Sequence, residues 1–234
     1  MSSISYNLQA VRDRIMAEAR AMSRDPHDIH LLAVSKTFGP DAVIEAAQSG
    51  QMAFGENYLQ EALDKMEAVR ALHPDLQLEW HFIGPIQSNK TRPIAEHFDW
   101  VHSVDREKIA LRLSEQRPPH LPPLNVCLQV NISGEASKSG ASAEEAENLA
   151  RRIADMPRLN LRGLMAIPEP VADPEKQRAP FRELRMLAER LRASGLKLDT
   201  LSMGMSADLA AAIAEGATIV RIGTAIFGKR DYAK

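Results

Sequence analysis

The segment Leu31-Leu32-Ala33-Val34-Ser35-Lys36-Thr37 begins as an apolar run and ends with a lysine. The run Ile29–Val34 is predicted to be a buried strand, because it is short, rich in branched residues and soon followed by Gly39-Pro40. Lys36 would then lie beside an apolar core. Burial disfavours the ammonium form, and a neutral lysine amine is the nucleophile that forms Schiff bases. The plainer alternative is a lysine that extends its charged end into solvent.

Further strand-like segments follow this one, and helical patterns separate them. The predicted strands are Ile29–Val34, Met52–Phe54, Leu78–Ile83, Trp100–Ser103, Leu124–Ile132, Leu161–Ile167, Leu198–Met203 and Thr218–Ile222. Such alternation predicts an α/β fold with a parallel sheet and right-handed crossovers. Eight units favour a closed (β/α)8 barrel of the TIM type, with a doubly wound open sheet as the alternative. We expect a single domain over residues 1–234.

The helical segments carry several terminal signals. An extra amphipathic helix is predicted before the first strand, with one face formed by Leu8, Val11, Ile15 and Ala19. Asp105 is predicted to cap the helix that ends before Pro118-Pro119. Ser142 and Glu145 have the spacing of a capping box. The proline-rich stretch Pro168–Pro180 is predicted to be an exposed, mobile loop, with a helix at Phe181–Ala193.

Composition excludes several classes of function. The 234 residues include 29 basic and 31 acidic ones, without a basic patch, so nucleic acid is not an expected partner. No apolar stretch approaches the roughly 18 residues of a membrane span, and the N-terminus does not resemble a secretory signal. Cys127 is the only cysteine, so the cytoplasm is the expected compartment. Its apolar neighbours predict a small buried side chain rather than a nucleophile.

Two loops near the C-terminus are candidates for a phosphate site. In a barrel of this kind, phosphate is often held by the loops after the last two strands. Ser206 follows the seventh predicted strand and opens a predicted helix, Ser206–Glu215, whose first N–H groups suit an anion. Gly223 and Thr224 follow the eighth strand and offer close backbone approach, an N–H group and a hydroxyl. A simple helix cap and a tight turn are the plainer alternatives.

Arg221 lies within the last strand among apolar neighbours, where a buried arginine needs a partner. That partner is either a carboxylate of a neighbouring strand or a ring nitrogen of a bound cofactor. The first and last strands are adjacent in a closed barrel, so Lys36 and Arg221 would share one mouth. A Schiff-base lysine, an arginine that faces a pyridine nitrogen and a phosphate site together indicate pyridoxal 5'-phosphate (PLP).

The chain resembles the YggS/PROSC family of pyridoxal phosphate homeostasis proteins, and the resemblance runs nearly end to end. The motifs that carry it are Ala33-Val34-Ser35-Lys36-Thr37, Phe54-Gly55-Glu56-Asn57-Tyr58, residues 80–90 (WHFIGPIQSNK), Ser137-Lys138-Ser139-Gly140, residues 163–168 (GLMAIP), Ser202-Met203-Gly204-Met205-Ser206 and residues 221–228 (RIGTAIFG).

The resemblance implies a barrel similar to the N-terminal domain of alanine racemase. It implies that Lys36 forms the Schiff base with PLP, that Arg221 faces the pyridine nitrogen, and that Asn57 lies near the cofactor. It also implies that the phosphate is held by Ser206, Gly223 and Thr224. The implied role is PLP buffering or delivery, with apo forms of PLP-dependent enzymes as candidate recipients.

Three other residues have less specific signals. His81 and His102 end predicted strands, and each could face the mouth or form hydrogen bonds within the core. No second ligand shows metal-binding spacing near them, so no metal is expected. Lys138 follows the fifth strand, where a solvated loop lysine is the default and a second amine that receives the cofactor is the sharper alternative.

PLP usually implies catalysis, so an enzyme must be weighed against a carrier. In alanine racemase the second base comes from another domain, and we expect no such domain after the last strand here. An arginine that stays protonated leaves the pyridine nitrogen unprotonated, which weakens the ring as an electron sink. We therefore expect a binding protein, and a monomer, without robust turnover. A small amino-acid racemase is the alternative, and a barrel aldolase that uses Lys36 on its substrate is a third hypothesis.

Overall fold

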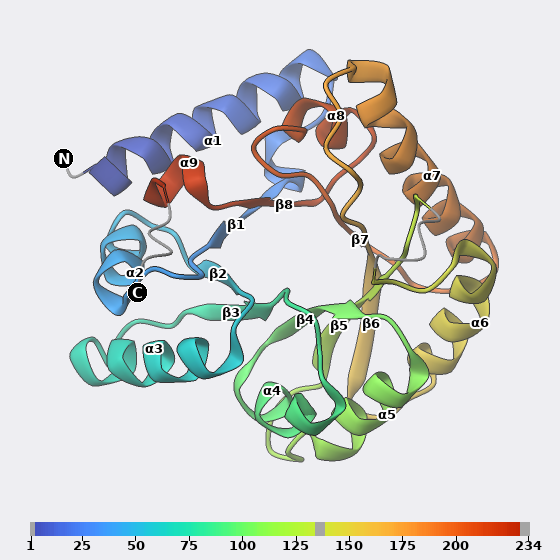
Figure 1. Ribbon diagram of the computed structural model, residues 1–234, viewed down its shortest axis with the longest axis horizontal. Helices are drawn as coiled ribbons and strands as arrows, with labels where there is room; N and C mark the ends of the chain where they lie inside the picture. The colour runs from blue at the N-terminus through green and yellow to red at the C-terminus, as the bar shows by residue number, and fades with distance from the viewer. Residues whose placement is uncertain (1–2, 134–138, 230–234) are drawn as a thin grey trace.

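Parallel strands close into one barrel in the order β1 to β8 (Figure 1). The computed structural model describes residues 3–133 and 139–229. The strands are β1 (His30–Val34), β2 (Ala53–Glu56), β3 (Glu79–Phe82), β4 (Trp100–Val104), β5 (Leu124–Gln129), β6 (Leu159–Met165), β7 (Thr200–Ser202) and β8 (Ile219–Ile222). β8 pairs with β1, from His30↔Ile219 to Ala33↔Ile222. This pairing confirms the closed barrel, and the open-sheet alternative is wrong.

Helices surround the barrel (Figure 1). The α-helices of the described residues are α1 (Ser3–Ala21), α2 (Pro40–Gln48), α3 (Leu59–Leu72), α4 (Thr91–His97), α5 (Glu107–Gln116), α6 (Ala143–Ala154), α7 (Pro174–Ala193), α8 (Leu209–Ala214) and α9 (Thr224–Phe227). Short 3-10 helices, η1 (Pro26–Asp28) and η2 (Ser88–Lys90), precede β1 and α4. No helix in the described ranges has the length and apolar character needed to cross a membrane.

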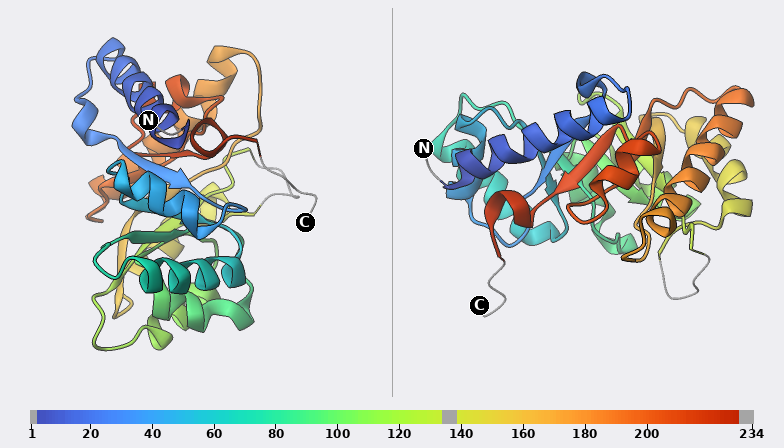
Figure 2. Two further views of the ribbon diagram at one scale, coloured as in Figure 1. Left: turned by 90° about the vertical axis from the view of Figure 1, so that its left-hand side faces the viewer. Right: turned by 90° about the horizontal axis from the view of Figure 1, so that it is seen from above.

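The predicted extra helix at the N-terminus is confirmed as α1. Figure 2 shows it lying along the side of the barrel beside α8 and α9, both of which it contacts. Its buried residues are Leu8, Val11, Ile15 and Ala19, which form the predicted apolar face. Burial of this face packs α1, the first helix of the described chain, against α8 and α9, the last two.

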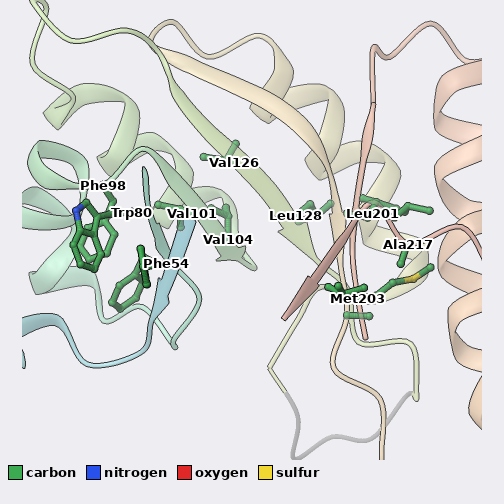
Figure 3. Close-up of a cluster of buried hydrophobic side chains, with 14 of the residues drawn as sticks. Phe54, Trp80, Phe98, Val101, Val104, Val126, Leu128, Leu201, Met203 and Ala217 are labelled. Atoms are coloured by element: carbon green, nitrogen blue, oxygen red, sulfur yellow. The ribbon is translucent and has the colours of Figure 1, made fainter. Parts of the chain in front are cut away.

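Apolar side chains fill the layer between strands and helices. Figure 3 shows part of this layer, where Phe54, Trp80 and Phe98 gather at one side. A smaller cluster includes Leu32 and Cys127. Burial raises the pKa of the Cys127 thiol to about 12. The prediction of a small, buried cysteine is confirmed, and this pKa favours the neutral thiol at neutral pH.

The predicted loop Pro168–Pro180 is partly wrong, because α7 begins at Pro174. Asp173 caps this helix by accepting the Lys176 N–H at 3.0 Å, and Pro174 occupies a first-turn position that needs no donor. Pro180 lies inside α7, where a proline costs about 3 kcal/mol. Burial of the apolar face of α7 outweighs that cost, so residues 174–180 are helical.

Two other local predictions are corrected. Asp105 does not cap α5, whose first flanking residue is Arg106; the Asp105 carboxylate accepts a hydrogen bond from Arg106 instead. β5 ends at Gln129 rather than Ile132. In contrast, the capping box of α6 is confirmed, since Ser142 accepts the Glu145 N–H and Glu145 accepts the Ser142 N–H.

Candidate functional site

The residues predicted to bind a cofactor come together at the carboxyl ends of neighbouring strands. Leu32 of β1 is aligned with Arg221 of β8, so Lys36 follows one strand where Gly223 follows the other. Asn57 comes directly after β2, which pairs with β1. The barrel therefore brings these positions to one mouth, the usual place of the site in this fold.

Lys36 is half-buried, and the backbone on both sides of it is held by α3. The next residue, Thr37, has a φ of 70°, a left-handed conformation that costs a non-glycine residue on the order of 1 kcal/mol. The Thr37 N–H donates to Glu61 Oε1 at 2.6 Å. On the other side, the Ser35 carbonyl accepts a hydrogen bond from Lys65 Nζ at 2.9 Å. These contacts fix the position from which the Lys36 side chain projects.

A buried ion pair supports this segment from behind. Lys65 Nζ lies 2.6 Å from Glu56 Oε1, and the two side chains are 2% and 0% exposed. The Ser35 hydroxyl also donates to Glu56 Oε1 at 2.6 Å. Burial raises the pKa of Glu56, while Lys65 and the hydroxyl oppose the rise. Lys65 was not among the residues predicted for the site, although its spacing of four from Glu61 is the signal of a helical ion pair.

Asn57 presents a polar atom that lacks a partner. Its Oδ1 is buried and makes no hydrogen bond to the described part of the chain. Its backbone is packed so closely on Gly84 that a Cβ there would lie 2.3 Å from the Asn57 carbonyl oxygen. Any larger residue at Gly84 would move Asn57. A buried amide oxygen held in this way is suited to a ligand, because an unpaired polar group is costly.

Arg221 is buried inside the barrel, with 5% of its surface exposed. It donates to Ser202 Oγ at 2.8 Å and to the Ala166 carbonyl at 3.0 Å. Burial lowers its pKa to about 10, while the charge of Asp208 opposes that change, so the guanidinium is a cation at neutral pH. No carboxylate within residues 3–133 and 139–229 forms a salt bridge with it. The carboxylate alternative considered for Arg221 is therefore not found in that part of the structure.

Ser206 lies in a turn and does not open a helix as predicted. α8 begins at Leu209, and the flanking residue is Asp208. Asp208 Oδ1 accepts the Met205 N–H at 2.6 Å, which closes the turn around Ser206. Burial raises the pKa of Asp208, with the Met205 hydrogen bond in opposition. Two residues, Ala207 and Asp208, therefore separate the serine from the start of the helix.

Gly223 and Thr224 do open a short helix, α9. The first hydrogen bonds of α9 are donated by Ile226 and Phe227 to the Gly223 carbonyl. The N–H groups of Thr224 and Ala225 have no backbone acceptor in the described segments, and the Thr224 side chain is exposed. These donors fit an oxyanion, so the residues present at the mouth match the polar groups of PLP.

The remaining candidates have different outcomes. His81 and His102 are both buried and hydrogen-bonded to each other, at 2.8 Å, which confirms the core alternative for both. Lys138 lies outside the described residues. In those residues no group of three potential ligands is arranged to hold a metal ion.

A cavity of about 1280 Å³ opens at the other end of the barrel. Its wall includes the first residues of several strands, such as His30, Ala53 and Glu79. None of the predicted cofactor residues contributes to it. The candidate site at the carboxyl ends of the strands therefore rests on the side chains and backbone groups found there. It does not coincide with this cavity.

The chain matches the family described as alanine racemase, N-terminal domain, over residues 6–231. It is 63% identical to the pyridoxal phosphate homeostasis protein of Pseudomonas aeruginosa over 232 residues, which cover 99% of this chain and 98% of that protein. It is 56% identical to the pyridoxal phosphate homeostasis protein of Vibrio cholerae over 234 residues, which cover 100% of this chain and 99% of that one.

Solved structures show the same likeness. The PipY protein of Synechococcus elongatus PCC7942, solved with PLP bound, is 35% identical with a TM-score of 0.82, and the match covers 96% of this chain and 100% of PipY. An alanine racemase from Corynebacterium glutamicum shares the fold, with a TM-score of 0.67 at 18% identity; the match covers 99% of this chain and 62% of the racemase. By sequence and by fold, the chain thus belongs to the family of pyridoxal phosphate homeostasis proteins, built on the alanine racemase N-terminal domain.

Proposed function

We propose that this protein binds PLP at the carboxyl end of its barrel and acts in intracellular PLP homeostasis, by buffering or delivering the cofactor without robust catalytic turnover. The observation that carries the proposal is the alignment of β1 with β8. It brings Lys36 and the buried cation Arg221 to one mouth, beside the open donors of α9. PipY, with 35% identity, was solved with PLP bound, and the relatives are named for PLP homeostasis rather than for a reaction.

Each predicted residue has a proposed role. Lys36 forms an imine bond with the aldehyde of PLP, with loss of water. Arg221 donates to the pyridine nitrogen, and the Asn57 amide lies beside the ring. The phosphate is bound by Ser206, Gly223 and Thr224. The Ser206 part of this assignment rests on its hydroxyl and on the turn, because the structure removes the helix start that was predicted there.

The buffering role follows from the charge of Arg221. A guanidinium that stays protonated at neutral pH donates to the ring nitrogen and does not give up its proton. The ring then withdraws electrons weakly, which disfavours carbanion chemistry. An imine is also reversible, because a second amine can displace the lysine. We therefore place a monomeric carrier in the cytoplasm, with apo PLP-dependent enzymes as its recipients.

Two measurements test this proposal. The visible spectrum of the purified protein with PLP should show a lysine-linked chromophore that borohydride converts into a stable adduct at Lys36. The loaded protein should then be incubated with L- and D-amino acids while α-proton exchange and product formation are followed. We expect exchange of PLP but no sustained reaction. Turnover of any amino acid at about 1 per second or faster would instead indicate a small enzyme.

A further inference from the structure

A line of polar groups, buried except at its first member, Glu79, crosses the interior of the barrel from the cavity at its amino end to Arg221. Glu79 Oε1 lies 2.7 Å from His81 Nε2, and His81 Nδ1 lies 2.8 Å from His102 Nε2. His102 Nδ1 lies 2.7 Å from Ser202 Oγ, which accepts from Arg221. We call this line the Arg221 relay; its members are Glu79, His81, His102 and Ser202.

The chemistry of the two ends assigns every proton in the relay. Arg221 has only donors, so the Ser202 hydroxyl accepts from it and is free to donate its own proton to His102. His102 then carries its proton on Nε2 and donates to His81 Nδ1. His81 carries its proton on Nε2 and donates to the carboxylate of Glu79. All donors point the same way, and both imidazoles are neutral.

The opposite direction requires one additional proton at the Glu79 end. If His81 takes up a proton, both of its nitrogens become donors, and His102 must shift its own proton to Nδ1 to accept from it. Ser202 then receives hydrogen bonds from His102 and Arg221 at once. Its oxygen is a weaker acceptor for Arg221 in this state, because it no longer donates onward along a polarised chain.

Burial restricts proton entry to one end of the relay. His81, His102 and Ser202 are buried, while half of the Glu79 side chain is exposed to the cavity. The His81 ring is stacked on Trp100, with centroids 5.3 Å apart and planes 6° apart, so its orientation is fixed. A proton can therefore reach the relay through Glu79 without passing the cofactor mouth.

The charged surroundings favour the neutral state at neutral pH. Burial lowers the pKa of His81, against the effects of Glu79 and Asp99. Burial lowers the pKa of His102 further, helped by His81 and Arg221. The hydrogen bond from His81 lowers the pKa of Glu79, with burial opposing and His30 assisting.

Other charged groups face the same end of the barrel. Arg162 of β6 lies over the Trp100 ring at 4.7 Å, where its charge disfavours a second cation. Asp199 pairs with Arg162 at 2.8 Å and reduces that effect. The cavity wall also carries the groups of the N-terminal segment, namely Arg12, Arg20, Arg24, Asp25, His27 and Asp28. With these charges around it, the relay is in its neutral state at neutral pH and takes up a proton only as the pH falls.

We propose that the Arg221 relay positions Arg221, and that proton uptake at the amino end of the barrel loosens Arg221 and speeds release of the cofactor. This inference rests on the proposed function and adds a mode of regulation to it. The members of the relay are positioning residues, since in this proposal they act through Arg221.

The first test measures release of PLP from the loaded full-length protein against pH. We expect release to accelerate as pH falls in the unmodified protein. Glu79→Gln keeps an acceptor for His81 but removes the charge that favours protonation, so the midpoint should move down by about one pH unit or more. Asp28→Asn removes a charge from the same cavity outside the relay and should leave the midpoint in place. Superimposable profiles for Glu79→Gln and the unmodified protein would overturn the proposal.

A second variant cuts the relay next to Arg221. Ser202→Ala removes the hydroxyl that joins His102 to Arg221. Release of PLP should therefore become faster, and its rate should no longer depend on proton uptake by His81. A merely structural serine would leave the pH profile intact and change only the melting temperature. A Ser202→Ala protein that keeps the full pH step would contradict the relay.

The imidazole protons can be observed without any cofactor. Nitrogen-15 NMR of the histidine side chains, with assignments from single His81→Gln and His102→Gln variants, should show both rings neutral with the proton on Nε2. A proton on Nδ1 of His102 at neutral pH would overturn the relay even if PLP binds to Lys36. If both tautomers are as expected but PLP does not bind, the proposed function fails together with the control of release, and only the hydrogen-bonded line to Arg221 stands.

Discussion

Lys65 and Glu56 form an ion pair at 2.6 Å directly behind the segment that carries Lys36, and both side chains are buried. The same ammonium donates to the Ser35 carbonyl, and Glu61 accepts the Thr37 N–H. Lys65 and Glu61 of α3 therefore tie this helix to both neighbours of the candidate nucleophile. This relationship explains how Thr37 keeps its left-handed backbone in the folded state.

Removing one partner of this pair should destabilise the protein strongly. Lys65→Met leaves Glu56 buried without its counter-charge, and we expect a loss of about 3–5 kcal/mol in the free energy of unfolding, measured by urea denaturation. The exposed Lys108 of α5 is the matched control, and Lys108→Met should change that free energy by less than about 0.5 kcal/mol. Equal stabilities of the two variants would contradict a buried pair.

Acid should weaken the contact between α7 and α8. Glu215, after α8, forms salt bridges with three arginines of α7, namely Arg178, Arg182 and Arg185. Burial opposes the effect, but these arginines lower the pKa of Glu215. A depressed carboxyl pKa adds stability above the unfolded value of about 4.3, and this stability is lost as pH falls through the folded value.

The matching measurement compares melting curves of Glu215→Gln and the unmodified protein between neutral and acidic pH. The unmodified protein should be more stable at neutral pH, and the difference should shrink below about pH 4.3. Glu147→Gln, which removes an exposed partner of Arg151, should show almost no difference at any pH. A gap between Glu215→Gln and the unmodified protein that stays constant with pH would exclude this role for Glu215.

Lys36→Ala should abolish covalent attachment of PLP but retain part of its affinity, because the groups proposed to hold the phosphate follow other strands, β7 and β8. Borohydride treatment followed by mass spectrometry measures the adduct. Lys229→Ala removes an exposed lysine after α9 and should leave the yield unchanged. A normal adduct yield in Lys36→Ala would assign the imine to another lysine.

Arg221→Glu should weaken PLP retention and shift its absorption, since a carboxylate favours a protonated pyridine nitrogen. The spectrum and the dissociation constant should be measured on protein whose circular dichroism is unchanged. Arg221→Lys keeps a cation and should give an intermediate retention, because lysine cannot reproduce both hydrogen bonds of the guanidinium, to Ser202 and to the Ala166 carbonyl. Unchanged binding in the glutamate variant would show that Arg221 is a structural residue.

Local patterns in the chain predicted most elements, because each pattern reports burial on one face. The apolar run before Lys36 became β1, and the spaced residues of α1 became its buried face. Predictions of helix boundaries were wrong where packing between elements outweighed the preference of a single residue. Pro180 signalled a loop, yet packing of α7 overrode it; Asp105 had the chemistry of a cap, but the helix began after Arg106.

The sequence by itself determined the alternation of strands and helices, the Lys36 strand end and the Gly223-Thr224 loop, because these depend on neighbours along the chain. Only the tertiary structure decided which groups meet across the barrel. The pairing of Lys65 with Glu56 and the line from Glu79 to Arg221 join residues of separate elements. Such contacts depend on strand register and closure, which set partners far apart in the chain and which no local pattern specifies.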